Sequence, residues 1–124
     1  ESGLEAKTYD FLALEDKRTR SRMAVENGFI GFDAWVSPTT ADYPPLLSEL
    51  ANPDNAFKLA LGMTQNTQPA NYLGLCAVSI PLQTEGLPIG YQLMGAPGND
   101  LKLLEIAVEI EKMLKKKSLI ANKQ

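Results

Sequence analysis

The chain has 124 residues, of which 44% are hydrophobic and 22% charged, a composition typical of a globular domain rather than of a disordered segment. The 12 basic and 15 acidic side chains give a net charge of −3, so the basic excess that a broad nucleic-acid-binding surface needs is missing. The sequence contains no histidine, which excludes a Ser-His-Asp triad and any other imidazole-based mechanism within this chain.

The N-terminal segment is predicted to form a helix from Glu1 to about Asn27, because it holds no proline and ends at an Asn-Gly pair. Its basic residues suit either a solvated helix face, which the acidic composition favours, or a phosphate-binding patch. They are Lys17, Arg18, Arg20 and Arg22. The apolar run at residues 29–38 predicts a buried strand, and residues 39–53 are rich in turn-forming residues and predict a loop.

Asn52 and Pro53 predict the start of a second helix that runs to about Met63, since asparagine favours the N-cap and proline the first helical position. Pro69 is expected to open a further short helix. An apolar strand follows at residues 75–80. The next strand, at residues 89–95, alternates apolar and polar side chains, and the short Gly-containing turn between the two strands predicts an antiparallel hairpin.

The last helix is predicted to begin at Asn99-Asp100, and its apolar side chains recur at helical spacing. These side chains are Leu103, Ala107, Ile110 and Leu114. Asp100 in the first turn and the lysines near the end suit the helix dipole. Residues 118–124 are expected to form a frayed tail.

This order of elements predicts an α/β fold: a small mixed sheet of about three strands covered by helices, in a single domain over residues 1–124. The strands at 29–38 and 75–80 are apolar enough to be buried on both faces. Three strands make a small sheet, so we expect it to be part of a larger one.

No nucleophile has a recognisable base in the sequence. Ser79 lies among apolar residues and is expected to be a core serine, and Cys76 is expected to be an inert buried thiol. Gly98 is expected to serve a turn rather than an anion site, because Asp100 follows it. The acidic residues lack metal-loop spacing, so neither a metal nor a cofactor site is expected.

One polar stretch directly follows a predicted strand. Ser37 and Pro38 lead into Thr39 and Thr40, at the carboxyl end of the strand, where open α/β sheets bind ligands. The two threonines are either turn residues bonded to nearby backbone or part of a substrate-pocket wall. We keep both interpretations and take Thr39 and Thr40 as the candidate wall residues.

Four segments together resemble the amidase signature family. Residues 32–39 are similar to its strand that ends in Pro-Thr, and Thr64 with residues 71–81 is similar to its Thr, Asn, Gly and Pro segment. Residues 86–95 match its glycine- and proline-containing hairpin strand, and residues 100–104 fit the following helix. The resemblance covers about residues 6–114, and Cys76 stands where the family more often has proline.

The resemblance implies a Ser-Ser-Lys mechanism whose residues belong to a Gly/Ser-rich upstream half. No segment here matches a Gly-Gly-Ser-Ser run, and Lys58 and Lys102 do not lie in the family's lysine segment, so no catalytic residue is carried over. The implied identity is the C-terminal part of an amidase, with strands of its large mixed sheet, covering helices and part of the pocket for a small amide substrate.

Three functions stay open. The chain is a segment of an amide hydrolase that is inactive alone, an independent non-catalytic interaction domain with the same fold, or a piece of the amidase subunit of a glutamine-dependent amidotransferase. The expected partner is the remainder of the amidase domain or another copy of the chain, giving dimers or larger species through sheet edges.

The lone cysteine, Cys76, excludes an intrachain disulfide and predicts a reducing, cytoplasmic location. No apolar run approaches the ~20 residues that cross a bilayer, and the N-terminus lacks the pattern of a signal peptide. We therefore expect neither a membrane nor a nucleic acid among the partners.

Overall fold

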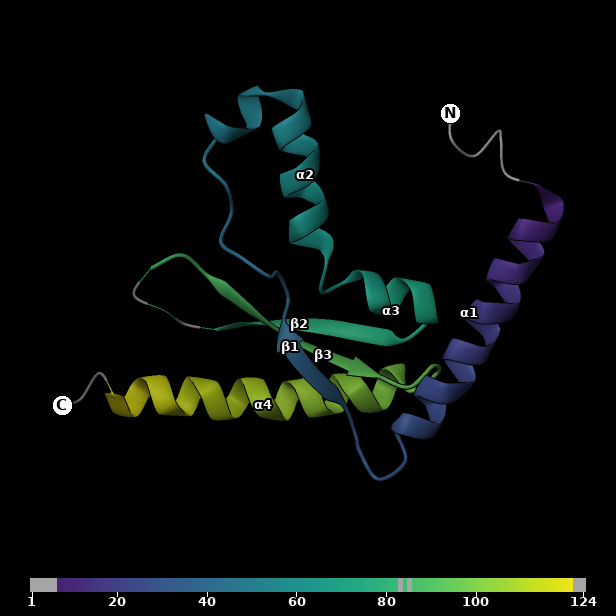
Figure 1. Ribbon diagram of the computed structural model, residues 1–124. Coiled ribbons are helices and arrows are strands. Elements are labelled where there is room, and N and C mark those ends of the chain that lie inside the picture. Colours follow the sequence, from purple (N-terminus) through teal and green to yellow (C-terminus); the bar gives the residue numbers. More distant parts are fainter. Residues whose placement is uncertain (1–6, 83, 85, 122–124) are drawn as a thin grey trace.

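The computed structural model describes residues 7–82, 84 and 86–121. Helices flank a short sheet, with α4 along one face and α3 above the other (Figure 1). The elements in chain order are α1 (Thr8–Gly28), β1 (Trp35–Pro38), the 3-10 helix η2 (Glu49–Ala51), α2 (Pro53–Thr64), α3 (Gln68–Leu73), β2 (Cys76–Leu82), β3 (Ile89–Gly95) and α4 (Asp100–Ala121). The α/β class is therefore confirmed.

The sheet has the strand order β1-β3-β2, and both pairs are antiparallel. A mixed sheet was expected, but within the described residues β2 and β3 form a hairpin and β1 adds antiparallel to the other side of β3. The two strands expected to be buried on both faces are instead the edges. Val36 in β1 is 55% exposed, and exposed residues alternate with covered ones in β2. The central strand β3 carries the consecutive buried residues, from Gln92 to Gly95.

The apolar stretch at residues 29–38 is a strand only over its last four residues, which corrects the longer predicted strand. Its first part continues the end of α1 as turns, with Phe29 N–H donating to the Val25 carbonyl and Phe32 N–H to the Phe29 carbonyl. Phe29 is buried and stacks on Trp35 with ring centroids 4.5 Å apart. The ring of Phe29 thus packs on the strand that follows, while the backbone of Phe29 is not part of that strand.

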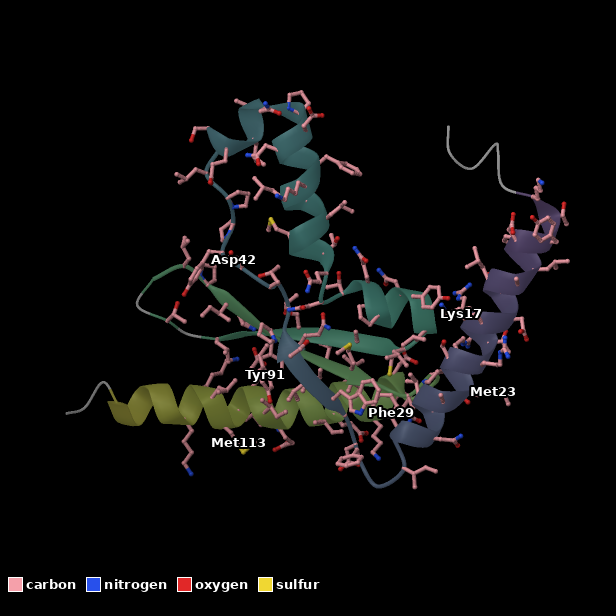
Figure 2. All side chains as sticks on the ribbon, viewed as in Figure 1. Lys17, Met23, Phe29, Asp42, Tyr91 and Met113 are labelled. Atoms are coloured by element: carbon pink, nitrogen blue, oxygen red, sulfur yellow. The ribbon has the colours of Figure 1, made fainter. Side chains whose placement is uncertain are left out.

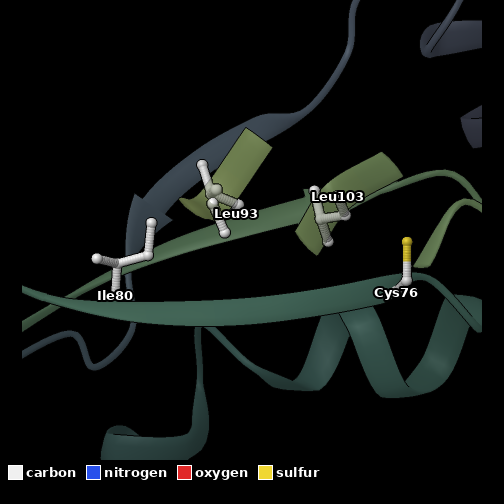
Figure 3. Packing of buried hydrophobic residues seen from close by; sticks show 5 residues of the cluster. Cys76, Ile80, Leu93 and Leu103 are labelled. Carbon is white, nitrogen blue, oxygen red and sulfur yellow. The ribbon is translucent and has the colours of Figure 1, made fainter. Parts of the chain in front are cut away.

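The core lies between the sheet and α4 (Figure 3). Its buried members are Cys76, Ile80, Leu93, Leu103 and Ala107. The predicted apolar stripe of α4 is confirmed, since Ile110 and Leu114 pack against the same cluster. Tyr91 also packs there, beside α4 (Figure 2). Burial of this cluster removes apolar surface from water and so stabilises the fold.

Helix α1 buries none of its residues, and Met23 is 60% exposed. It meets α3 through Arg18, whose Nε donates to the Tyr72 carbonyl at 2.7 Å and whose guanidinium lies over the Tyr72 ring. Arg20 pairs with Asp16 on the solvated side. The basic run therefore includes one residue that holds two helices together.

The ends of the chain are described in part. Residues 1–6, where the first helix was expected to begin, lie outside the described residues, as do residues 122–124. Helix α4 runs to Ala121 and so extends into the segment expected to be a tail. Residues 39–53, expected to be a loop, include η2 just before the predicted start of α2.

Candidate functional site

The face of the sheet opposite α4 carries a row of polar side chains. The register places Ser37 of β1 and Ser79 of β2 on either side of Gln92 in the central strand. Successive residues of a strand alternate between faces, so this row points away from the apolar core. Gln92 is 3% exposed and is the one buried polar residue among the described residues, whereas Ser79 is exposed.

A hydrogen bond crosses the sheet just beyond this row. Thr39 Oγ1 and Ser79 Oγ lie 2.5 Å apart, and Thr39 N–H donates to the Gly90 carbonyl at 2.8 Å. Gly90 makes the hydroxyl contact sterically feasible, because a Cβ at this position would lie 2.4 Å from Thr39 Oγ1 and 2.7 Å from Ser79 Oγ. The end of β1 is thereby tied to both other strands.

A second set of bonds starts at the buried amide. Gln92 Nε2 donates to the Asn66 carbonyl at 3.1 Å, and Asn66 Nδ2 donates to the Pro38 carbonyl at 2.9 Å. Asn66 lies in the connection between α2 and α3, and Pro38 ends β1. The buried amide of Gln92 therefore has a hydrogen-bond partner. Through that partner it links two segments that are distant in the sequence.

A cleft of about 240 Å³ opens where β1 ends. Its lining residues are Pro38, Thr40, Ala41, Asp42, Tyr43, Pro44, Pro88 and Ile89. A larger hollow of about 590 Å³ lies between the same segment and α2. Residues 41–44, with Asp42 labelled in Figure 2, form the wall shared by the two hollows.

The two candidate wall residues have different positions. Thr40 lines the 240 Å³ cleft, whereas the hydroxyl of Thr39 is bonded to Ser79 and does not line it. Both side chains are half-buried. The prediction that they face a substrate in an intact enzyme stays a prediction, and the geometry favours Thr40 for that role.

Ser79 is not the core serine that the sequence indicated. It lies on the face of β2 opposite α4, where it is exposed, and its hydroxyl bonds to Thr39. Cys76 is buried, and its thiol donates to the Ala96 carbonyl at 3.2 Å. Gly98 has a φ of +79° just before α4, which agrees with the turn role expected for it.

The hydroxyl and amide groups of the candidate site, in the described part of the chain, are joined by hydrogen bonds. Among its hydrogen bonds, no serine, threonine or cysteine side chain is paired with a lysine amine. Within residues 7–82, 84 and 86–121, histidine, cysteine, aspartate and glutamate side chains do not gather in threes as a metal site would need. No helix in that part is both long and apolar enough to span a bilayer.

Sequence reasoning missed Gln92 and Asn66. The available signal was a lone amide between apolar neighbours in a predicted strand, because a buried side-chain amide needs hydrogen-bond partners. Its partner, Asn66, lies 26 residues away, and no local pattern points to it.

The fold belongs to a known class. The amidase family model matches residues 2–104 of the chain. Mandelamide hydrolase of Pseudomonas putida is 40% identical over 86 residues, which are 66% of this chain and 16% of that protein. A glutamyl-tRNA(Gln) amidotransferase subunit of Dehalococcoides mccartyi (strain CBDB1) is 36% identical over 107 residues, which are 84% of this chain and 21% of that protein.

Solved structures agree with these sequence matches. The structure of 6-aminohexanoate cyclic dimer hydrolase is similar with a TM-score of 0.76 at 28% identity, over 89% of this chain and 25% of that one. The corresponding glutamyl-tRNA(Gln) amidotransferase subunit from Thermotoga maritima has a TM-score of 0.70 at 30% identity, over 82% of this chain and 22% of that one. The chain belongs to the amidase family, and it spans 16% and 21% of the length of the two curated relatives named above.

Proposed function

We propose that this chain is the C-terminal segment of an amidase that hydrolyses a linear amide C–N bond, and that it is inactive alone. A serine nucleophile supplied by the rest of that protein would form an acyl-enzyme and release ammonia or an amine. The observation that carries the proposal is the combination of family membership with the lack of any nucleophile–base pair in the described residues. The segment contributes sheet strands and the wall of the 240 Å³ cleft.

The test of inactivity compares the 124-residue chain with the full-length protein that carries it. Both are assayed against a panel of aliphatic and aryl amides, with release of the amine as the readout. We expect turnover only from the full-length protein. Turnover by the chain itself that is lost in Ser79→Ala or Cys76→Ala would contradict the proposal, because it would reveal a nucleophile in this segment.

The role of the wall is tested by a matched pair of variants in the full-length protein. Thr40→Val removes a hydroxyl that lines the cleft, whereas Thr39→Val removes one that is bonded to Ser79. We expect Thr40→Val to change the ratio of kcat/KM between two amides by a factor that corresponds to about 0.5–1.5 kcal/mol in transition-state free energy. Thr39→Val is expected to lower the melting temperature instead. An unchanged amide preference in Thr40→Val would reject the wall assignment.

The proposed partner is the remainder of the amidase domain, or another copy of the chain where that remainder is absent. Strands β1 and β2 form the two edges of the sheet, and unpaired edges add strands readily. The outer side of α4 exposes Leu101, Leu104 and Val108, which suits further cover. Sedimentation of the isolated chain is expected to show dimers or larger species, and a monomer at high concentration would contradict this.

A second candidate function is a part of the amidase subunit of a glutamine-dependent amidotransferase. It is favoured by the 36% identity to a subunit of such an enzyme. Glutaminase activity that depends on another subunit, measured on the full-length protein, would select it over a free amide hydrolase. A reducing, cytoplasmic location is part of both proposals and is consistent with the free thiol of Cys76.

A further inference from the structure

The wall of the cleft is attached to the sheet at few points. Helices α2 and η2 pack mainly on each other and stand away from the sheet (Figure 1). This pair is joined to the rest by two connections, residues 39–48 after β1 and residues 65–67 before α3. The position of the wall, residues 40–44, therefore depends on how these two connections are anchored.

Two amide side chains, those of Gln92 and Asn66, tie the connection before α3 to the sheet and to the end of β1. The other connection begins at Thr39, which is bonded separately to β2 and β3. Gln92 in the central strand donates to the carbonyl of Asn66 in the connection before α3, and the amide of Asn66 donates to the carbonyl of Pro38, the last residue of β1 before the other connection. The distances are 3.1 Å and 2.9 Å. Gln92 is 3% exposed, so water has little access to its side-chain amide. Breaking its hydrogen bond therefore leaves a buried polar group without a partner, which costs free energy.

We propose that Gln92 is a positioning residue that holds the cleft wall in place through Asn66 and the Pro38 carbonyl. The wall then keeps one orientation relative to the sheet, and the size of amide that the cleft admits is set by it. The assignment of the cleft to an amide substrate rests on the proposed function, whereas the anchoring itself does not. Gln92 and Asn66 would thus govern selectivity without touching the reacting atoms.

The anchoring is tested by hydrogen exchange followed by mass spectrometry on the full-length protein that carries this chain. Gln92→Met keeps the length of the side chain and removes its donor. Asn66→Ala removes only the second bond, because the backbone carbonyl that Gln92 binds is retained. The matched control is Gln65→Ala, since Gln65 is the exposed neighbour of Asn66 and its side chain makes no hydrogen bond within the described part of the chain.

We expect exchange in peptides covering residues 38–50 to accelerate by about tenfold or more in Gln92→Met and in Asn66→Ala, with β2 and α4 unchanged. Gln65→Ala should exchange like the parent protein. Acceleration in Gln92→Met but not in Asn66→Ala would mean that Gln92 acts only by packing, and it would overturn the proposal. No acceleration in either variant would overturn it as well. If Gln92→Met disturbs the whole sheet, Asn66→Ala alone decides.

The consequence for selectivity needs a kinetic readout. In the full-length protein, Gln92→Met and Asn66→Ala are expected to change KM for large amides relative to small ones while kcat changes little. A preference that is unchanged despite faster exchange would reject the positioning role. The exchange experiment uses no amide, so a failure of the proposed hydrolytic function is distinguishable from a failure of this anchoring.

Discussion

The hydroxyl oxygens of Thr39 and Ser79 lie 2.5 Å apart, although Ser79 lies in one edge strand of the sheet and Thr39 directly follows the other. Gly90 in the central strand lies between them and leaves room for the contact. The hydrogen bond spans 40 positions of sequence and fixes the chain where it leaves β1. The absence of a side chain at Gly90 thus helps to set the direction in which the chain leaves β1 toward the cleft wall.

Replacing Gly90 is expected to break this contact. In Gly90→Ala the new Cβ would lie 2.4 Å from Thr39 Oγ1, so the strand end must shift. We expect a loss of about 1–3 kcal/mol in the free energy of unfolding, measured by urea denaturation. The control is Gly62→Ala in α2, where no atom lies within 4 Å and helix propensity gains about 0.5–1 kcal/mol. Equal effects of the two variants would contradict the steric argument.

Truncation of the core side of α4 should be far more damaging than truncation of its outer side. Leu103 is 3% exposed and packs on the sheet, whereas Leu101, two positions away, is 78% exposed. Leu103→Ala is expected to lower the free energy of unfolding by about 2–5 kcal/mol. Leu101→Ala should change it by less than about 0.5 kcal/mol in the isolated chain. Thermal unfolding of both variants measures the difference, and a similar melting temperature would refute the proposed packing.

The start of α2 depends on the side chain of Asn52. Its Oδ1 accepts from the backbone N–H groups of Asp54 and Asn55 at 2.9 Å and 3.2 Å. Asn52→Ala is expected to destabilise the helix by about 0.5–2 kcal/mol, because these N–H groups lose their acceptor. Hydrogen exchange in the first turn of α2 reports this directly. Ser48→Ala is the control, since Ser48 precedes η2 without a side-chain cap bond.

The ion pair between Lys102 and Asp33 should contribute little. Lys102 Nζ lies 2.7 Å from Asp33 Oδ1, but the two side chains are 55% and 73% exposed. Lys102→Met is expected to lower the free energy of unfolding by less than about 1 kcal/mol, because water screens exposed pairs. The difference should shrink further as salt is raised. A larger loss that persists at high salt would show that the lysine stem is needed for packing.

Local chemistry in the sequence determined the helices and the hairpin. Asn52 and Pro53 predicted the start of α2, and the 3.6-residue spacing of Leu103 and Ala107 predicted which side of α4 is buried. The strand Ile89–Gly95 was predicted from its alternation and its neighbouring turn. Each of these features depends on residues that are close together in the sequence, so the local sequence pattern is sufficient to predict it.

Tertiary structure alone decided which strand is central and which polar groups meet. β3 pairs with both other strands and is therefore the central strand. The apolar segments at 29–38 and 75–80 were expected in the interior of the sheet, but the first ends in the edge strand β1 and the second lies in the edge strand β2. Phe29 stacks on Trp35 instead of extending the strand. Ser79 reaches Thr39, and Gln92 reaches Asn66, only because the strand order brings distant segments together. Such contacts depend on which edges pair after collapse, and periodicity within a single segment carries no information about that choice.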